Sequence, residues 1–223
     1  MKQLLLDLNA DAPPQLDNFV IGDNAAAVHA VERAVAGDGH VYLWGLAGCG
    51  RSHLLNAAVA AARDAARPAM YLAGAEVGAE LPDTPGLLLA IDDIDTLAEA
   101  ARTALFNTFN RAREHHQTLI LAGPCAPREL TLREDVRTRI GQCLGFELHA
   151  LDDATRAAIL TMLARRRGLE LGDEVLAFLL RHGRRDLANL VRVLDALDRA
   201  SLEHKRPITL PLLRELMQLG LDI

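Results

Sequence analysis

Glycines, an arginine and a hydroxyl follow a short apolar run at the spacing of a phosphate-binding loop. The apolar residues 41–44 end at Gly45, and four residues later Gly50-Arg51-Ser52 opens a stretch rich in alanine and leucine. The pattern is G-x-x-x-x-G-K-[ST], with arginine where lysine usually stands. Glycine permits backbone angles that are closed to other residues, so successive N–H groups can turn towards a phosphate. A helix after the loop would direct its positive end at the same anion.

The side chains of this loop predict a nucleotide bound together with magnesium. The candidate nucleotide-binding residues of the stretch are Gly45, Gly48, Cys49, Gly50, Arg51, Ser52 and His53. The Ser52 hydroxyl would bind Mg²⁺ between the outer phosphates. Arg51 keeps a positive charge but replaces a compact ammonium by a planar fork, which changes how a terminal phosphate is held. We therefore expect nucleotide binding to persist and turnover to be weak. A tight turn without a ligand is the alternative.

A second motif places carboxylates at the end of another apolar run. Residues 87–91 are apolar and are followed by Asp92 and Asp93. Asp92, at the end of the strand, would hold the water shell of the metal, and Asp93 could orient an attacking water. This is the Walker B arrangement. Together with the glycine-rich loop it predicts a P-loop nucleotide-binding fold.

The composition limits the class of protein. The chain has 223 residues, half of them hydrophobic, and a formal net charge of −6, which argues against strong autonomous DNA binding. Cys49, Cys125 and Cys143 lack C-x-x-C spacing, and His29 and His40 lack partners at ligand spacing. We expect a cytoplasmic protein without a disulfide framework, a secretory leader or a membrane span, in which both histidines are ordinary core or surface residues.

Strand and helix signals alternate up to about residue 150, and only helical signals follow. Strands are predicted at 41–44, 69–72, 87–92, 118–122 and 144–148, and helices at 25–36, after the glycine-rich loop, at 96–117 and at 129–139. This alternation predicts an α/β fold with a five-stranded parallel sheet and helices on both faces. Helices predicted at 152–167, 173–182, 186–204 and 209–219 would form a small lid. The expected parts are a tail, 1–14, a nucleotide-binding domain, 15–150, and a helical lid domain, 151–223.

The first residues carry a short leucine pattern ahead of two prolines. Gln3, Leu4, Leu6 and Leu8 form Q-L-x-L-x-L, which resembles the peptides by which bacterial replication proteins bind the sliding clamp. Gln3 would make polar contacts, and the leucines would fill a pocket of the clamp. A first strand or an unrelated leucine-rich start are the alternatives.

These motifs together resemble the DnaA-related AAA+ family of bacterial replication proteins. The resemblance rests on the residues 17–22 (DNFVIG), 45–55 (GLAGCGRSHLL), 91–94 (IDDI), 136–140 (VRTRI) and 184–187 (RRDL), and it covers about residues 15–220. Unlike DnaA, the chain leaves no room after Leu219 for a helix-turn-helix domain, and it has only the leucine peptide in place of a long N-terminal region. Both departures, and the RSHLL form of the loop, resemble the Hda family of DnaA inactivators.

The resemblance implies an adenine nucleotide, ADP or ATP, bound with Mg²⁺ between an AAA+ sheet and its lid. The residues implied along the adenine are Phe19, Val20 and Ile21, with Gly22 permitting the turn. Arg185 would reach from the lid to the phosphates of the same nucleotide, with the adjacent Arg184 as its alternative.

The resemblance also implies an arginine finger. At the position of Arg139, an arginine of this family reaches the nucleotide of a neighbouring molecule and stabilises charge on the transferring γ-phosphate. Arg137 could share this role. The alternative is that these arginines pair with Glu134 or Asp135 on the surface.

The function implied is negative regulation of replication initiation. Bound to the DNA-loaded sliding clamp, the β subunit of DNA polymerase III, the protein would promote hydrolysis of DnaA-bound ATP through Arg139 in trans, with DNA contacted mainly through the clamp. Its own turnover is expected to be weak or absent, because Arg51 replaces lysine and Gly123-Pro124 stands where a polar sensor-1 side chain is usual. The alternatives are a DnaA-related adaptor or helicase loader with its own ATP cycle, and a stand-alone P-loop NTPase. A homodimer is compatible with AAA+ surfaces.

Overall fold

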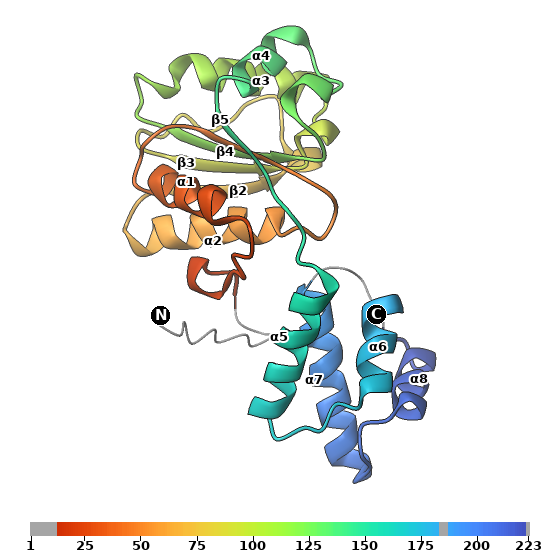
Figure 1. The fold of residues 1–223 in the computed structure, drawn as a ribbon. Coiled ribbons are helices and arrows are strands. Elements are labelled where there is room, and N and C mark those ends of the chain that lie inside the picture. Colours follow the sequence, from red (N-terminus) through yellow and green to blue (C-terminus); the bar gives the residue numbers. More distant parts are fainter. Residues whose placement is uncertain (1–12, 183–186, 222–223) are drawn as a thin grey trace. The chain divides into compact units, whose positions relative to one another are not determined.

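The computed structural model of the protein describes residues 13–182 and 187–221. The chain forms two compact units, one of residues Pro13–His149 and one that begins at Ala150. The first, named here the α/β unit, contains the sheet, and the second, the helical unit, contains α5 to α8 (Figure 1).

The α/β unit is built on a parallel sheet. Its strands are β1 (Val41–Trp44), β2 (Ala69–Ala73), β3 (Leu88–Asp92), β4 (Thr118–Gly123) and β5 (Leu144–Glu147), and its helices are α1 (Ala25–Val35), α2 (Arg51–Asp64), α3 (Glu99–Ala112) and α4 (Glu134–Ile140). The strand order is β2-β3-β4-β1-β5, and every neighbouring pair is parallel. The predicted five-stranded parallel sheet is therefore confirmed.

The strand order sets the place of the site. From β1 the chain passes to β2 at one edge of the sheet, and it later reaches β5 on the other side of β1. In open parallel sheets, ligands bind at the carboxyl ends of the strands beside such a switch point. The glycine-rich loop leaves β1 at this position.

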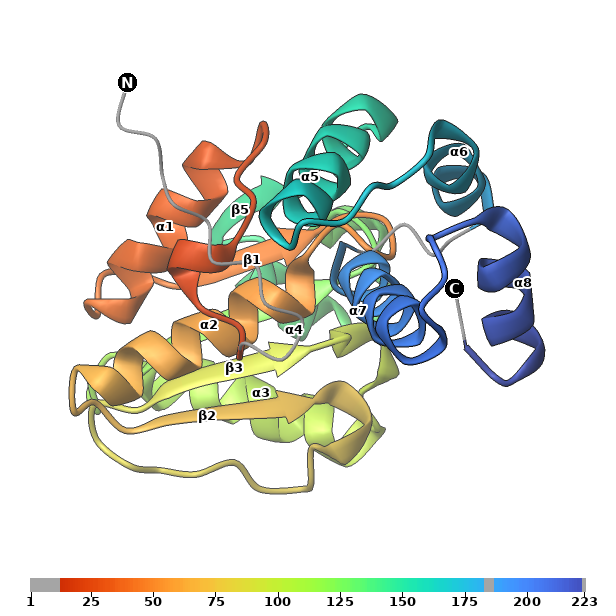
Figure 2. The same ribbon diagram turned by 90° about the horizontal axis from the view of Figure 1, so that it is seen from below.

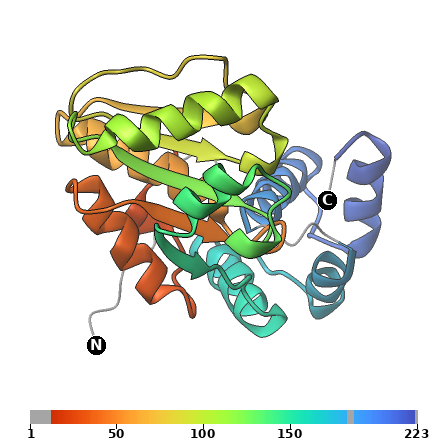
Figure 3. The same cartoon turned by 90° about the horizontal axis from the view of Figure 1, so that it is seen from above.

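Alternating side chains cover the two faces of the sheet separately. Val41 and Leu43 pack with α1 and α2, whereas Tyr42 between them packs with α3 and α4. Figure 2 shows α1 and α2 across one face, and Figure 3 shows α3 and α4 across the other. The period of two that strands impose therefore produces one core on each face.

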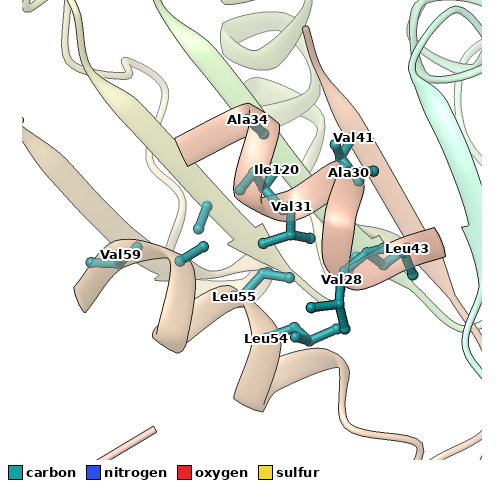
Figure 4. Close-up of a cluster of buried hydrophobic side chains, with 14 of the residues drawn as sticks. Val28, Ala30, Val31, Ala34, Val41, Leu43, Leu54, Leu55, Val59 and Ile120 are labelled. Carbon is teal, nitrogen blue, oxygen red and sulfur yellow. The ribbon is translucent and has the colours of Figure 1, made fainter. Parts of the chain in front are cut away.

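The core beneath α1 and α2 holds the helix that follows the loop. Leu54 and Leu55 are fully buried there, beside Val31 of α1 and Ile120 of β4 (Figure 4). Complete burial of one such side chain stabilises the fold by about 1.5–3 kcal/mol. The start of α2 is thereby held against the sheet.

Two predicted helices are shorter than expected. The helix predicted at 96–117 begins only at Glu99, after a 3₁₀ turn at Ile94–Thr96, and ends at Ala112. The helix predicted at 129–139 begins at Glu134, because Leu130 and Leu132 are both buried in the core beneath α3 and α4. Two buried side chains two residues apart require an extended backbone, which places successive side chains on opposite sides.

The helical unit contains α5 (Asp153–Arg166), α6 (Asp173–His182), α7 (Leu187–His204) and α8 (Leu210–Gln218). The Asp152 carboxylate accepts a hydrogen bond of 2.6 Å from the backbone N–H of Thr155 and so caps the start of α5. Leu160 of α5, Leu197 of α7 and Leu213 of α8 meet in the core of the unit. The predicted small helical domain is confirmed.

No helix within residues 13–182 and 187–221 is long and apolar enough to cross a membrane.

Candidate functional site

The glycine-rich loop has the backbone that a phosphate-binding loop requires. Gly45, Gly48 and Gly50 have φ angles of +154°, +81° and +101°, a region that residues with side chains rarely adopt. A Cβ atom on Gly45 would lie 2.4 Å from the carbonyl oxygen of Leu148. Cys49 is buried in the core and therefore anchors the loop to it. Burial also raises the pKa of the Cys49 thiol.

Phe19 closes the end of the loop. Its ring is 8 % exposed, and a Cβ atom on Gly50 would lie 2.7 Å from its Cε2 atom. Val20 and Ile21 beside it are half-buried, and Gly22 adopts a φ of +50°. The predicted adenine segment therefore packs directly on the loop, with Phe19 turned into the core and its neighbours partly open.

His53 lies in the first turn of α2 and contacts the segment that precedes α1. Its Nε2 atom lies 3.2 Å from the carbonyl oxygen of Gln15, and its ring centre lies 5.6 Å from that of Phe19. Burial lowers the pKa of this imidazole. His53 therefore packs on the predicted adenine segment, and its role in nucleotide binding stays a prediction.

Arg51 is enclosed and paired with the second acidic residue of the Walker B motif. Its side chain is 14 % exposed, and its Nη2 atom lies 3.4 Å from a carboxylate oxygen of Asp93. The Nη1 atom is buried without a hydrogen-bond partner among the residues that the structure describes. A buried donor without an acceptor costs free energy, so an oxygen of a bound phosphate would be a favourable partner.

Asp92 is the buried carboxylate of the site. It is 2 % exposed at the end of β3, and its two oxygens accept hydrogen bonds from the backbone N–H of Asp93, at 2.9 Å, and from the Tyr71 hydroxyl, at 3.1 Å. Both contacts restrict the rotation of the carboxylate. The structure therefore holds a carboxylate in a defined orientation next to the loop.

Asp93 adopts a left-handed conformation, with φ +45° and ψ +54°. This turn ends β3 and is packed against Gly74, where a Cβ atom would lie 2.3 Å from the carbonyl oxygen of Asp93. Burial and the charge of Asp92 raise the pKa of the Asp93 carboxyl, and Arg51 opposes this effect. Asp93 is therefore positioned by backbone geometry and held by Arg51.

The donor set suits a magnesium ion that is held mainly by a nucleotide. Ser52 is exposed in the first turn of α2, and Asp92 supplies a carboxylate. No group of three or more His, Cys, Asp or Glu residues capable of holding a metal occurs in the described part of the chain. Mg²⁺ commonly takes one or two protein ligands, with waters and phosphate oxygens as the rest. Ser52 and Asp92 fit this role.

The missing sensor-1 side chain has a structural cause. A Cβ atom on Gly123, the last residue of β4, would lie 2.6 Å from the Tyr42 hydroxyl. Tyr42 is fully buried and donates a 2.6 Å hydrogen bond to the carbonyl oxygen of Cys125, and burial raises the pKa of its phenol. The phenol of β1 thus fills the space that a polar side chain of residue 123 would need.

Arg139 lies on α4, half-exposed, with partners only from α3 among the described residues. Its Nη2 atom donates a 2.7 Å hydrogen bond to the side-chain oxygen of Asn110, and its guanidinium carbon lies 5.8 Å from the ring centre of Phe106. Asp135 pairs instead with Arg133. Because both partners of Arg139 are neutral, its positive charge is positioned without being neutralised. The side chain of Arg137 makes no hydrogen bond or ion pair with the residues that the structure describes.

Some predicted site residues lie outside the described residues. These are the tail residues Gln3, Leu4, Leu6 and Leu8, and Arg184 and Arg185 of the helical unit. Their predicted roles stay predictions.

The sequence patterns did not identify the side chains that position the predicted site residues. Tyr71 binds Asp92, Tyr42 fills the place beside Gly123, and Asn110 holds Arg139. The chain contains only two tyrosines, both in apolar strands. A buried phenol needs a polar partner, so this was the signal available in the sequence.

Comparisons with known proteins identify relatives of the helical unit and of the fold. Residues 153–217 match the family model described as the lid domain of Hda. Domain III of the replication initiation protein DnaA from Thermotoga maritima is similar at 21 % identity and a TM-score of 0.76, over 96 % of this chain and 99 % of that chain.

Two further structures show the same fold. DnaA from Aquifex aeolicus, in a structure with bound AMPPCP, has 22 % identity and a TM-score of 0.69 over 87 % of this chain and 68 % of that chain. A single-residue variant of Thermotoga maritima RuvB has 18 % identity and a TM-score of 0.67 over 93 % of this chain and 72 % of that chain. At these identities the likeness concerns the fold.

Proposed function

On the premise that this chain is an AAA+ protein related to Hda and DnaA, we propose that it regulates replication initiation by acting with Arg139 on ATP-bound DnaA. The observation that carries the proposal is the contrast between its two key arginines. Arg51 in its own loop is paired with a carboxylate, whereas Arg139 is held by a neutral amide and an aromatic ring. The charge that remains available to another molecule is that of Arg139.

The chain's own nucleotide has a structural role in this proposal. The loop glycines, the orphaned Nη1 atom of Arg51 and the Ser52 hydroxyl favour an adenine nucleotide with Mg²⁺, as does the AMPPCP in the related DnaA structure. Mg²⁺ would neutralise phosphate charge there. Arg51 is committed to Asp93, and Gly123 carries no sensor side chain, so both features weaken hydrolysis at this site. ADP is therefore the proposed working ligand.

Arg139 would act on the transferring phosphoryl group of DnaA-bound ATP. A guanidinium there stabilises negative charge that develops on the phosphoryl oxygens. Arginine fingers raise rates by roughly 10³- to 10⁵-fold. Asn110 and Phe106 hold the guanidinium on α4, which reduces the conformational entropy lost when it engages. The segment Gln3–Leu8 would bind the DNA-loaded sliding clamp and so raise the local concentration of the regulator at replicating DNA.

The test is ATP hydrolysis by DnaA in the presence of this protein and clamp-loaded DNA. Wild-type protein should stimulate hydrolysis, and Arg139→Ala and the Gln3→Ala/Leu4→Ala variant should both lose the stimulation while still binding ADP. Arg137→Ala, on the same helix, is the matched control and should retain most of the stimulation. Equal stimulation by wild type and Arg139→Ala would reject the arginine-finger role.

The same assay distinguishes the proposed function from its alternative. A DnaA-related adaptor or helicase loader would work through its own ATP cycle. Stimulation that survives the tail and Arg139 changes but disappears in Ser52→Ala would support that alternative instead.

A further inference from the structure

The buried carboxylate of Asp92 depends on a side chain from the neighbouring strand. Asp92 is 2 % exposed, so an ionised carboxyl there requires hydrogen bonds to replace water. The backbone N–H of Asp93 serves one oxygen, at 2.9 Å, and the Tyr71 hydroxyl serves the other, at 3.1 Å. Of these two donors, only Tyr71 is a side chain that a substitution can remove.

The sheet register explains how Tyr71 reaches this carboxylate. Ala73 of β2 is paired with Asp92 of β3, and Tyr71 is two residues earlier on β2. Side chains two residues apart lie on the same face of a strand. Tyr71 packs against the core beneath α1 and α2, so its phenol extends along the face that also carries the start of α2.

Asp92 and Ser52 are the two residues that fit a magnesium ion on a bound nucleotide. The Tyr71 hydroxyl therefore orients one of the two protein groups of that site.

We propose that Tyr71 is a positioning residue for a nucleotide-bound divalent cation. It fixes the orientation of the Asp92 carboxylate through the hydrogen bond of its hydroxyl. This inference rests on the proposed binding of an adenine nucleotide with Mg²⁺. It adds a residue from β2 to a site whose other residues come from the loop, α2 and β3.

The test compares magnesium dependence with nucleotide affinity. ADP binding by wild type and Tyr71→Phe is measured by calorimetry in EDTA and across a Mg²⁺ titration, with melting curves to verify folding. Groups that orient metal ligands typically contribute roughly 10- to 100-fold to metal affinity. Tyr71→Phe should raise the half-saturating Mg²⁺ concentration by about 10-fold and leave ADP affinity in EDTA unchanged.

Two further variants test the positioning role. Thr108→Val removes another buried hydroxyl, one that donates to the Ala104 carbonyl oxygen on α3, and should leave the Mg²⁺ dependence unchanged. In an Asp92→Asn background, Tyr71→Phe should cause no further shift, because the carboxylate it orients is gone.

The outcomes separate this inference from the proposed function. If wild-type protein binds no ADP, the proposed nucleotide site is wrong. If wild type binds ADP with a clear Mg²⁺ dependence and Tyr71→Phe has the same dependence, only the role of Tyr71 is overturned. If Tyr71→Phe does not fold, the Mg²⁺ titration of Asp92→Asn is used instead. A Mg²⁺ dependence equal to that of wild type rejects the inference, because Tyr71 would then orient a carboxylate that does not serve the cation, and a raised half-saturating Mg²⁺ concentration supports it.

Discussion

Arg51 and Arg139 carry the same guanidinium on two helices of one unit, in opposite surroundings. Arg51 is 14 % exposed and lies 3.4 Å from the carboxylate of Asp93, whereas Arg139 is half-exposed and is held by the Asn110 amide and the Phe106 ring. A carboxylate partner neutralises a guanidinium, and a neutral partner only orients it. The comparison teaches that the identity of the partner, more than exposure, decides which arginine can act on another molecule.

Removing Arg51 should have a large effect on the binding of the chain's own nucleotide. Arg51→Ala should weaken ADP binding by about 10- to 100-fold, because a hydrogen bond to a charged group contributes about 1.5–3 kcal/mol. Calorimetry measures the affinity, and Arg139→Ala is the matched control that should bind ADP normally. Comparable losses in both variants would remove the distinction between the two arginines.

Adding a side chain at position 123 should lower the free energy of unfolding of the protein. Gly123→Ala places a Cβ atom 2.6 Å from the Tyr42 hydroxyl, and such overpacking costs about 1–3 kcal/mol. Urea unfolding measures the loss. Tyr42→Phe removes the clashing oxygen, so the double variant should be less destabilised than the sum of the two single variants. Simple additivity would show that the phenol does not fill this space.

Removing one of the two contacts of the Arg139 guanidinium should reduce the stimulation of ATP hydrolysis by DnaA without abolishing it. Asn110→Ala removes the 2.7 Å hydrogen bond to the guanidinium but leaves the Phe106 contact. Stimulated ATP hydrolysis by DnaA should fall about five-fold, equivalent to about 1 kcal/mol, while ADP binding by the variant stays normal. An unchanged rate would mean that Arg139 needs no such support.

Removing the carboxylate beside Arg51 should make that arginine more like Arg139. Asp93→Asn should tighten ATP binding by about 2- to 5-fold and ADP binding less, because a half-exposed ion pair contributes only about 0.2–1 kcal/mol and ATP carries more charge. Fluorescence titration with both nucleotides measures the change, which should shrink at high salt. Weaker ATP binding would indicate that Asp93 supports the nucleotide directly.

Lowering the pH should destabilise the fold without changing the partners of Arg51 and Arg139. The Nδ1 atom of His40 accepts a 3.1 Å hydrogen bond from the backbone N–H of Leu119, and burial lowers the pKa of His40 from its ordinary 6.5. Below pH 6.5 the unfolded chain therefore binds more protons than the folded one, and the free energy of unfolding should decrease as pH falls through the folded pKa.

Urea unfolding at several pH values between 8 and 5 checks this effect. His53, whose pKa is also lowered by burial, contributes in the same direction. His40→Gln should flatten part of the slope, since glutamine does not titrate. A stability that rises towards pH 5 would contradict the assignment of a neutral His40.

Much of the fold could be read from local patterns. The apolar runs before Gly45 and Asp92 became β1 and β3, and the helical segments after residue 150 became α5 to α8. The failures occurred where tertiary contacts overrode local preference. Leu130 and Leu132 read as part of a helix, but both insert into the core beneath α3 and α4, and the helix begins only at Glu134.

The site residues also divide into those that local patterns predict and those that depend on tertiary contacts. The spacing of Gly45, Gly50, Arg51 and Ser52 follows from the chain itself, because a loop between a strand and a helix brings near neighbours together. By itself, the sequence therefore determined the phosphate loop, the carboxylates after β3 and the alternation that builds the sheet.

Only the tertiary structure decided which groups hold these residues. Tyr71 lies 21 residues from Asp92, and Asn110 lies 29 residues from Arg139. Such pairs depend on strand register and helix packing, which no local pattern specifies. The physical reason is that hydrogen bonds depend on distances of a few tenths of an ångström, whereas sequence periodicity determines only which face a side chain occupies.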